Sequence, residues 1–184
     1  MTEFMYELKI PKDRVAVLIG KGGAVKKIIE EETGTKIRVD SQEGDIFVTG
    51  DDGVKLYSAK ELITAIGRGF NPEIAQLLLH SDYMFEILNI TEFCKTKNDM
   101  IRVKGRVIGS DGKCRRIIEE MTECHISVYG KTISLIGKTE NVSIARRATE
   151  SLLRGSPHRN VYKFLENQRR ELKQQNFLTK EDLK

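Results

Sequence analysis

Ile19-Gly20-Lys21-Gly22-Gly23 is followed, after two residues, by Lys26-Lys27-Ile28-Ile29-Glu30, and the chain repeats this arrangement. Ile108-Gly109-Ser110-Asp111-Gly112 is followed by Arg115-Arg116-Ile117-Ile118-Glu119, at an offset of 89 residues from Gly20 to Gly109. Each copy holds a Gly-x-x-Gly turn, two basic residues and an apolar pair. A repeated unit of this kind predicts two similar domains in a chain of 184 residues.

The hydrophobic pattern around each copy predicts the same order of elements: strand, helix, helix, strand, strand, helix. Alternating apolar residues indicate strands, and spacing by three and four residues indicates helices. In the first copy the strands cover 4–10, 36–40 and 46–49, and the helices cover 13–19, 25–33 and 53–68. In the second copy the strands cover 83–90, 125–129 and 132–136, and the helices cover 98–108, 112–121 and 141–154. Gly50 matches Gly137 at an offset of 87, so the second hairpin is two residues shorter.

Two Pro-containing stretches predict the segments outside the repeats. Asn71 as a cap and Pro72 at the first helical position predict a connecting helix over 73–80. Ser156-Pro157 likewise predicts a last helix over 157–173, followed by a polar, frayed remainder. The predicted domains are therefore residues 1–70 and 83–155. A connecting helix lies in 71–82, and a C-terminal helix and tail occupy 156–184.

The helical spacing also predicts which side chains point into the core. In the second helix of the first repeat we expect Val25, Ile28 and Ile29 to point inward. The apolar stripe of the third helix is predicted to contain Val54, Leu56, Tyr57, Leu62, Ile63 and Ile66.

The composition is that of a soluble globular protein, with 39% hydrophobic and 32% charged residues. No apolar run is long enough to cross a bilayer, and residues 1–12 contain no apolar signal core. The three cysteines form no C-x-x-C pair, which fits a reducing compartment. We therefore expect a cytoplasmic protein without a membrane segment. The net charge is only +4, so the distribution of basic residues is more informative than their total.

The Gly-x-x-Gly turns are suited to binding a phosphate backbone. Glycine removes the Cβ atom and allows positive φ, so another chain can approach closely. The helix that follows offers unpaired N–H groups and the positive end of its dipole. Lys21 adds a charge to the first turn, whereas Asp111 beside Ser110 would repel a phosphate unless it points away. Neither turn fits a P-loop or a dinucleotide-binding pattern.

Together, these residues resemble the core of a KH domain, whose GXXG loop clamps about four nucleotides of backbone. The resemblance covers residues 4–69 and 83–154. It implies an α+β fold of two type I KH domains in tandem plus a C-terminal helix. Each domain has the order βααββα, with a three-stranded antiparallel sheet packed on three helices. Many KH domains carry Ile three places after the second loop glycine. At that position this chain has Lys26 in the first repeat and Arg115 in the second.

Three further stretches narrow the resemblance to one family. They are Ala65 to Phe70, His125 to Thr132, and Gly155 to Tyr162. With these stretches the chain resembles the two-KH "partner of Nob" proteins that process small-subunit ribosomal RNA, in particular an archaeal member. The family implies binding of single-stranded RNA near the 3′ end of 16S-type ribosomal RNA. It also implies contact with a PIN-domain endonuclease and, in the archaeal branch, with the alpha subunit of initiation factor 2.

The candidate RNA-binding residues are the two turns and the basic residues beside them. They are Gly20, Lys21, Gly22, Gly23, Lys26, Lys27, Lys104, Arg106, Ile108, Gly109, Ser110, Asp111, Gly112, Lys113, Arg115 and Arg116. Further candidates for an apolar groove or for the core are Val17, Ile19, Ile28, Ile37, Ile117 and Ile126. Lys21 favours the first turn, while the larger number of basic neighbours favours the second, and the sequence alone does not rank them cleanly.

Three alternative functions remain to be weighed. Catalysis is not expected, because the acidic runs 30–32 and 51–52 do not converge on one point and the three histidines are scattered. We therefore predict no metal and no cofactor. A protein-interaction scaffold would use Val54, Leu56 and Tyr57 or the tail residues Phe164 and Leu165. An RNA-degradation subunit usually adds another nucleic-acid-binding barrel, for which this chain leaves no room.

Overall fold

The structure is a computed structural model that describes the backbone of residues 4–181, with the side chains of residues 4–172 and of Gln174. Residues 1–3 and 182–184, which the predicted first domain and tail include, lie outside the described residues. The chain divides into two compact units, Met1–Phe85 and Glu86–Lys184. Each unit is described by itself.

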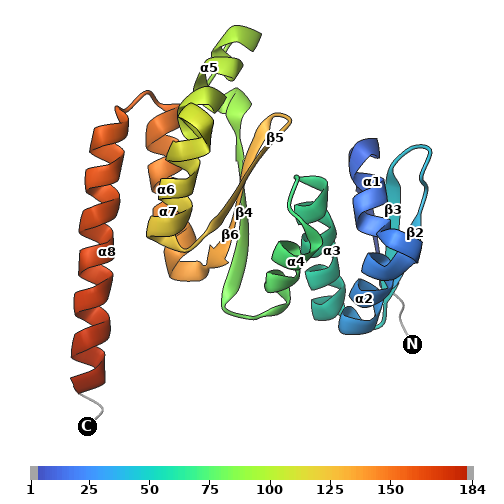
Figure 1. The fold of residues 1–184 in the computed structure, drawn as a ribbon. Helices are drawn as coiled ribbons and strands as arrows, with labels where there is room; N and C mark the ends of the chain where they lie inside the picture. Colours follow the sequence, from blue (N-terminus) through green and yellow to red (C-terminus); the bar gives the residue numbers. More distant parts are fainter. Residues whose placement is uncertain (1–3, 182–184) are drawn as a thin grey trace. The chain divides into compact units, whose positions relative to one another are not determined.

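The first unit contains a three-stranded antiparallel sheet and the three helices of the repeat (Figure 1). The strands lie in the order β1-β3-β2, so the last strand of the repeat is central. In chain order the elements are β1 (Phe4–Lys9), α1 (Lys12–Ile19), η1 (Lys21–Gly23), α2 (Ala24–Thr33), β2 (Lys36–Val39), β3 (Asp45–Gly50) and α3 (Gly53–Gly67). The segment after them forms α4 (Pro72–Ala75) and η2 (Gln76–Leu79), which pack against α3.

The second unit repeats this arrangement and adds a long helix on the outside of α6 and α7 (Figure 1). Its strands lie in the equivalent order β4-β6-β5. The elements are β4 (Tyr83–Asn89), η3 (Ile90–Glu92), α5 (Lys97–Ile108), η4 (Ser110–Gly112), α6 (Lys113–Thr122), β5 (His125–Tyr129), β6 (Thr132–Lys138), α7 (Thr139–Leu153) and α8 (His158–Glu181). The predicted α+β architecture, with the order βααββα occurring twice, is confirmed.

Equivalent residues fill the two cores, which explains why the repeats share a fold. Leu18 and Ile29 in the first unit match Val107 and Ile118 in the second at the offset of 89, and all four are at most 1% exposed. In the central strand Ile46 matches Ile133 at the offset of 87, and both are fully buried. Each buried side chain of this size contributes about 1.5–3 kcal/mol of transfer free energy. The helices therefore face the sheet through the same positions in both units.

Three of the predicted core positions are wrong. Ile28 is 42% exposed, because its neighbour Ile29 points into the core and consecutive helical residues lie about 100° apart. Val54 and Tyr57 are 77% and 48% exposed. They lie three residues apart on one face of α3, whereas the opposite face of that helix is buried through Leu56 and the other predicted residues.

The segments outside the repeats also differ from the expectation. The connecting segment is one turn of α-helix followed by a 3₁₀ turn, and the Asn71 side chain makes no capping hydrogen bond. The last helix continues to Glu181, past the predicted end at residue 173. No glycine or proline follows Pro157 in the sequence, and the Gln, Arg, Glu and Lys residues there favour helix.

Candidate nucleic-acid interface

Both Gly-x-x-Gly turns have the same backbone conformation. In the first, Gly20, Gly22 and Gly23 have φ values of 72°, 61° and 81°. In the second, Gly109 and Gly112 have φ values of 71° and 75°. The position that Gly22 occupies in the first turn is taken in the second by Asp111, with φ 51° and ψ 30°. The second turn therefore holds a residue with a Cβ atom in the left-handed region, which is unfavourable by about 1–2 kcal/mol for most residues.

The first glycine of each turn is required by packing inside the protein. A Cβ on Gly20 would lie 2.5 Å from Val25 Cγ2, and a Cβ on Gly109 would lie 2.7 Å from Cys114 Cβ. Val25 and Cys114 are equivalent residues in the first turns of α2 and α6. The close approach of loop and helix fixes where each helix begins relative to its loop.

The second glycine of each turn faces open space instead. No protein atom lies within 4 Å of a Cβ placed on Gly22 or Gly23, and only Arg116 Nη1, at 3.5 Å, lies near one on Gly112. Gly23 and Gly112 are also the N-caps of α2 and α6, and glycine has no side chain to bond the first-turn amides. The helix N-terminus thus remains accessible, which is the arrangement that binds phosphate oxygens.

A glutamate fixes each of these helices to the neighbouring strand. Glu30 Oε1 accepts a hydrogen bond of 2.7 Å from Ile37 N, and Glu119 Oε1 accepts one of 2.8 Å from Ile126 N. The four residues are equivalent at the offset of 89. The sequence analysis assigned no role to these glutamates, although their recurrence at the same position in both repeats was a usable signal.

Two of the three lysines in and beside the first turn form ion pairs within α2. Lys26 pairs with Glu30 and Lys27 pairs with Glu31, each at 3.7 Å and one helical turn apart. Among the described residues, Lys21 is exposed and has no carboxylate within ion-pair distance. The first turn therefore offers one unpaired cation to an anionic ligand.

The second turn keeps more unpaired charge. Arg115 pairs with Glu119 at 3.7 Å. Lys104, Lys113 and Arg116 have no carboxylate within ion-pair distance in the part of the chain that the structure describes. The exposed carboxylate of Asp111 offsets only part of this charge. The positive field is therefore stronger beside the second turn, which supports the second of the two rankings left open by the sequence.

The predicted site residue Arg106 has a structural task that the sequence analysis did not assign. Its Nη2 donates to the carbonyls of Gly155 and Ser156, the latter at 3.0 Å. His158 Nε2 lies 2.7 Å from the Arg106 carbonyl oxygen. Arg106 thereby joins the end of α5 to the connection between α7 and α8. In the first unit Arg14 donates to the carbonyls of Ile66 and Phe70, which is a comparable anchor.

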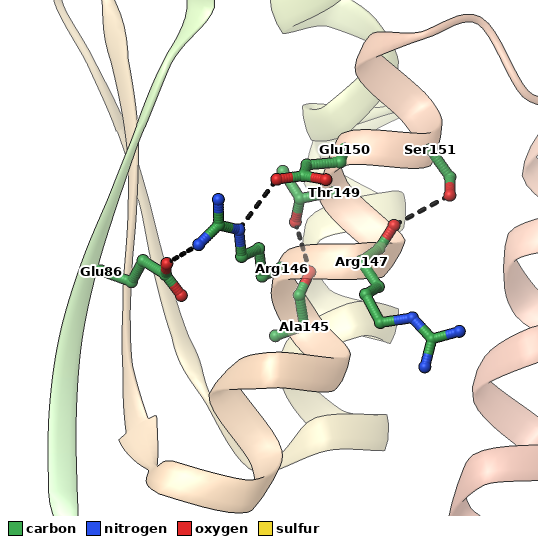
Figure 2. A network of polar contacts seen from close by, with 7 residues as sticks. All are labelled: Glu86, Ala145, Arg146, Arg147, Thr149, Glu150 and Ser151. Carbon is green, nitrogen blue, oxygen red and sulfur yellow. Dashed lines mark hydrogen bonds and ion pairs between the residues drawn. The ribbon is translucent and has the colours of Figure 1, made fainter.

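The basic pair Arg146-Arg147 on α7 is also engaged within the second unit. Figure 2 shows the guanidinium of Arg146 between Glu86 of β4 and Glu150 of its own helix. These carboxylates raise the pKa of Arg146, the hydrogen bond to Glu150 being the largest cause. The Arg147 guanidinium lies 5.0 Å from the Phe164 ring centroid of α8. The pair is thus part of the unit's internal structure.

Apolar side chains adjacent to the turns divide between core and surface. Ile37 and Ile126 are buried, at 3% and 4% exposed. The other candidates retain accessible surface, and Ile28 is the most exposed of them. They are Val17, Ile19 and Ile28 in the first unit, and Ile108 and Ile117 in the second. Each turn therefore has an apolar surface beside it that can contact a nucleobase.

The described residues contain neither a metal-ion site nor a membrane-spanning helix. No group of three or more His, Cys, Asp or Glu side chains is placed to hold a metal ion. No helix in the described part of the chain combines the length and the apolar character needed to span a membrane.

Comparison with known proteins agrees with this geometry. Residues 5–65 match a KH domain model, and residues 84–170 match the model described as a eukaryotic type KH-domain (KH-domain type I). The KH domain-containing protein MJ0443 of Methanocaldococcus jannaschii is 48% identical over 92% of this chain and 76% of the relative. The chain belongs to the partner-of-Nob family of KH proteins. The first matched region lies within the first copy of the βααββα order, and the second covers the second copy together with α8 as far as residue 170.

Further members of the partner-of-Nob family match over most of this chain. The aDim2p structure in an a/eIF2alpha-aDim2p-rRNA complex from Pyrococcus horikoshii OT3 has a TM-score of 0.86 and 44% identity, covering 92% of this chain and 96% of that one. The pre-rRNA-processing protein PNO1 of Yarrowia lipolytica is 25% identical, and this chain spans 63% of its length.

Proposed function

We propose that the protein binds single-stranded RNA during assembly of the small ribosomal subunit, near the 3′ end of 16S-type ribosomal RNA. The observation that carries the proposal is the second turn. It combines an accessible helix N-terminus with the unpaired cations Lys104, Lys113 and Arg116. The relatives support the same role, since one is named a pre-rRNA-processing protein and another was solved in a complex with rRNA.

In this proposal the second turn holds the RNA backbone. Phosphate oxygens accept hydrogen bonds from the first amides of α6, while Lys113 and Arg116 supply charge. Bases lie against the apolar surface of Ile108 and Ile117, and single-stranded RNA can present its bases in this way. The protein contributes binding and positioning, and no reaction is assigned to it. The first turn, with Lys21 alone unpaired, makes a weaker contact of the same kind.

The RNA target is tested by crosslinking bound RNA in cells and sequencing it. Reads concentrated at the 3′ end of the small-subunit ribosomal RNA are expected. Reads from messenger RNA would overturn the assembly role while leaving RNA binding intact. We further propose that the protein acts in the cytoplasm and meets a PIN-domain endonuclease at this RNA end. Recovery of that endonuclease with the RNA-bound protein, and its loss after RNase treatment, would test that contact.

Binding of a protein partner is a second proposed function, and an exposed surface of the first unit supports it. Val54 and Tyr57 project from α3, and Lys60 lies 5.4 Å from the Tyr57 ring centroid and 4.8 Å from that of Tyr6 on β1. The alpha subunit of initiation factor 2 is the proposed partner, because a relative was solved in a complex with it. The scaffold residues Leu56 and Leu165 are each 1% exposed and are therefore excluded as contacts.

The proposed partner contact is tested by Val54→Asp with a binding assay against the purified alpha subunit. Loss of binding with unchanged RNA affinity is expected. The control is Glu73→Gln, a change at an exposed residue of α4 on the same unit. Unchanged binding of Val54→Asp would exclude this surface.

A further inference from the structure

The second turn differs from the first in two residues of its flanking helices and in the helix that they contact. Arg106 and Cys114 flank the second turn at positions where the first repeat has Val17 and Val25, 89 residues earlier. Arg106 lies in the last turn of α5, three residues before Gly109. Cys114 lies in the first turn of α6, two residues after Gly112. Both contact α8, which has no counterpart in the first repeat.

On the α5 side, the contact runs through His158. The carbonyl oxygen of Arg106 lies 2.7 Å from His158 Nε2, and a carbonyl can only accept, so the ring nitrogen carries the proton and donates. The Arg106 guanidinium in turn donates hydrogen bonds to the carbonyls of Gly155 and Ser156, which precede α8. Arg106 at the end of α5 thus both accepts a hydrogen bond from α8 and donates hydrogen bonds to the segment just before it.

On the α6 side, the contact runs through Tyr162. Its ring lies against that of His158, one helical turn away, with centroids 6.1 Å apart and the planes inclined by 25°. Its side chain packs, partly buried, against the core cluster that contains Cys114, and burial, with a smaller contribution from the Cys114 thiol, raises the pKa of Tyr162 to about 12. Cys114 is 1% exposed and packs directly under Gly109.

These four residues, Arg106, Cys114, His158 and Tyr162, form what we call the α8 clasp. The clasp reaches both helices that flank the second turn, and Val161 and Leu165 hold α8 itself in the core. The turn that it flanks contains Asp111 in the left-handed region, where the first turn has Gly22. A residue with a Cβ atom disfavours that conformation, so the second turn depends more on its surroundings than the first does.

We propose that α8 is a positioning element for the second Gly-x-x-Gly turn, and that His158 and Tyr162 hold the turn in its RNA-binding conformation without touching RNA. The proposal rests on the proposed RNA binding. It adds that the affinity of the second turn depends on a helix outside the KH repeat, through the contacts of His158 and Tyr162, which have no counterpart in the first unit.

The test combines RNA binding with hydrogen exchange in the full chain. The probe is a short single-stranded RNA with the 3′-terminal sequence of archaeal 16S ribosomal RNA. His158→Leu removes the donor and should weaken binding about five- to tenfold, which is the worth of about one hydrogen bond. His158→Gln keeps a donor and should restore most of the affinity. In the free protein, His158→Leu should speed amide exchange at 109–113 and leave exchange at 20–24 unchanged.

Two controls separate positioning from general destabilisation. Ile133→Val shortens a buried side chain of β6, so it should lower the unfolding temperature and leave RNA affinity unchanged. Tyr162→Phe keeps the buried ring, and it replaces His158→Leu if that variant fails to fold. In a Gly112→Asp background, His158→Leu should cause no further loss, because both act through the same turn.

The outcomes distinguish the proposal from the function on which it rests. Unchanged affinity and unchanged exchange at 109–113 in His158→Leu would overturn the α8 clasp while leaving RNA binding in place. Losses that add in the Gly112→Asp background would also overturn it. A wild-type chain that fails to bind the probe would overturn the proposed function. In that case faster exchange at 109–113 would still support the α8 clasp, and unchanged exchange would overturn it.

Discussion

The second glycine of each turn offers a matched pair of substitutions that compares the two turns directly. Gly23 and Gly112 have nearly the same backbone angles, 81° and 11° against 75° and 12° for φ and ψ. A Cβ clashes at neither position, since the nearest atom is Arg116 Nη1 at 3.5 Å from that of residue 112, so aspartate fits at both at a similar conformational cost of about 1–2 kcal/mol. We expect Gly112→Asp to weaken RNA binding more than Gly23→Asp.

The size of the effect follows from the charge that aspartate places beside the bound phosphate. A carboxylate about 5 Å from a phosphate is repelled by about 1 kcal/mol in water and by about 3 kcal/mol at an effective dielectric constant of 20. A central value of about 2 kcal/mol corresponds to about a thirtyfold loss of affinity. Because Arg116 Nη1 lies near the Cβ position of residue 112, the new carboxylate would also neutralise one of the three unpaired cations.

The assay is a titration of single-stranded RNA at fixed salt, repeated over a salt series. Loss of one phosphate contact should reduce the slope of log affinity against log salt by about 0.7. Gly112→Ala and Gly23→Ala are the controls, since they introduce the backbone strain without the charge. Equal losses for the two aspartate variants, or a larger loss for Gly23→Asp, would refute the conclusion that the second turn dominates.

Three other predictions concern stability. Glu123→Gly replaces a residue at φ 54° where the first repeat has Gly34 at φ 62°, so it should stabilise the second unit by about 1 kcal/mol and raise the unfolding temperature; an unchanged or lower temperature would contradict this. Ile29→Ala should cost about 2–5 kcal/mol in chemical unfolding, whereas Ile28→Ala should cost under about 0.5 kcal/mol because that side chain is 42% exposed; similar costs would contradict the assigned orientation. Burial raises the pKa of Cys124 from 9.0 to about 11, so stability should be full below pH 9 and fall as pH rises through 11. Cys124→Ala should flatten this decline in the unfolding temperature, and an unaltered decline would assign it to other groups.

The repeat made most of the fold predictable from sequence. One offset of 89 residues aligns the turns, the buried Leu18 and Val107, and the glutamates that bond Ile37 and Ile126. Agreement between two copies corrects the errors of either one. The failures lie where periodicity is ambiguous, as at Ile28, which adjoins a core residue and has the same apolar character. Which of two neighbouring residues faces the sheet is set by packing against other elements.

The residues of the candidate site were predictable from the sequence, whereas many of their ion pairs and hydrogen bonds were not. The glycines of both turns were found because their spacing is local. The ion pairs of Lys26 and Lys27 lie within one helix and follow from the i, i+4 rule. The contacts of Arg106 with Gly155 and Ser156 join residues about 50 positions apart. No local pattern gives such a contact, and the role of α8 was missed for the same reason.

The two turns reach one backbone conformation by different means. In the first, Gly22 adopts the left-handed region without steric cost, and the first unit has no helix equivalent to α8. In the second, Asp111 occupies the same region, and α8 holds the flanking helices through Arg106 and Cys114. With the α8 clasp, the conformation of the second turn thus rests on a tertiary contact, where that of the first rests on a glycine. A conformation that depends on a tertiary contact can be altered from a distance, so binding at the second turn should respond to whatever changes α8.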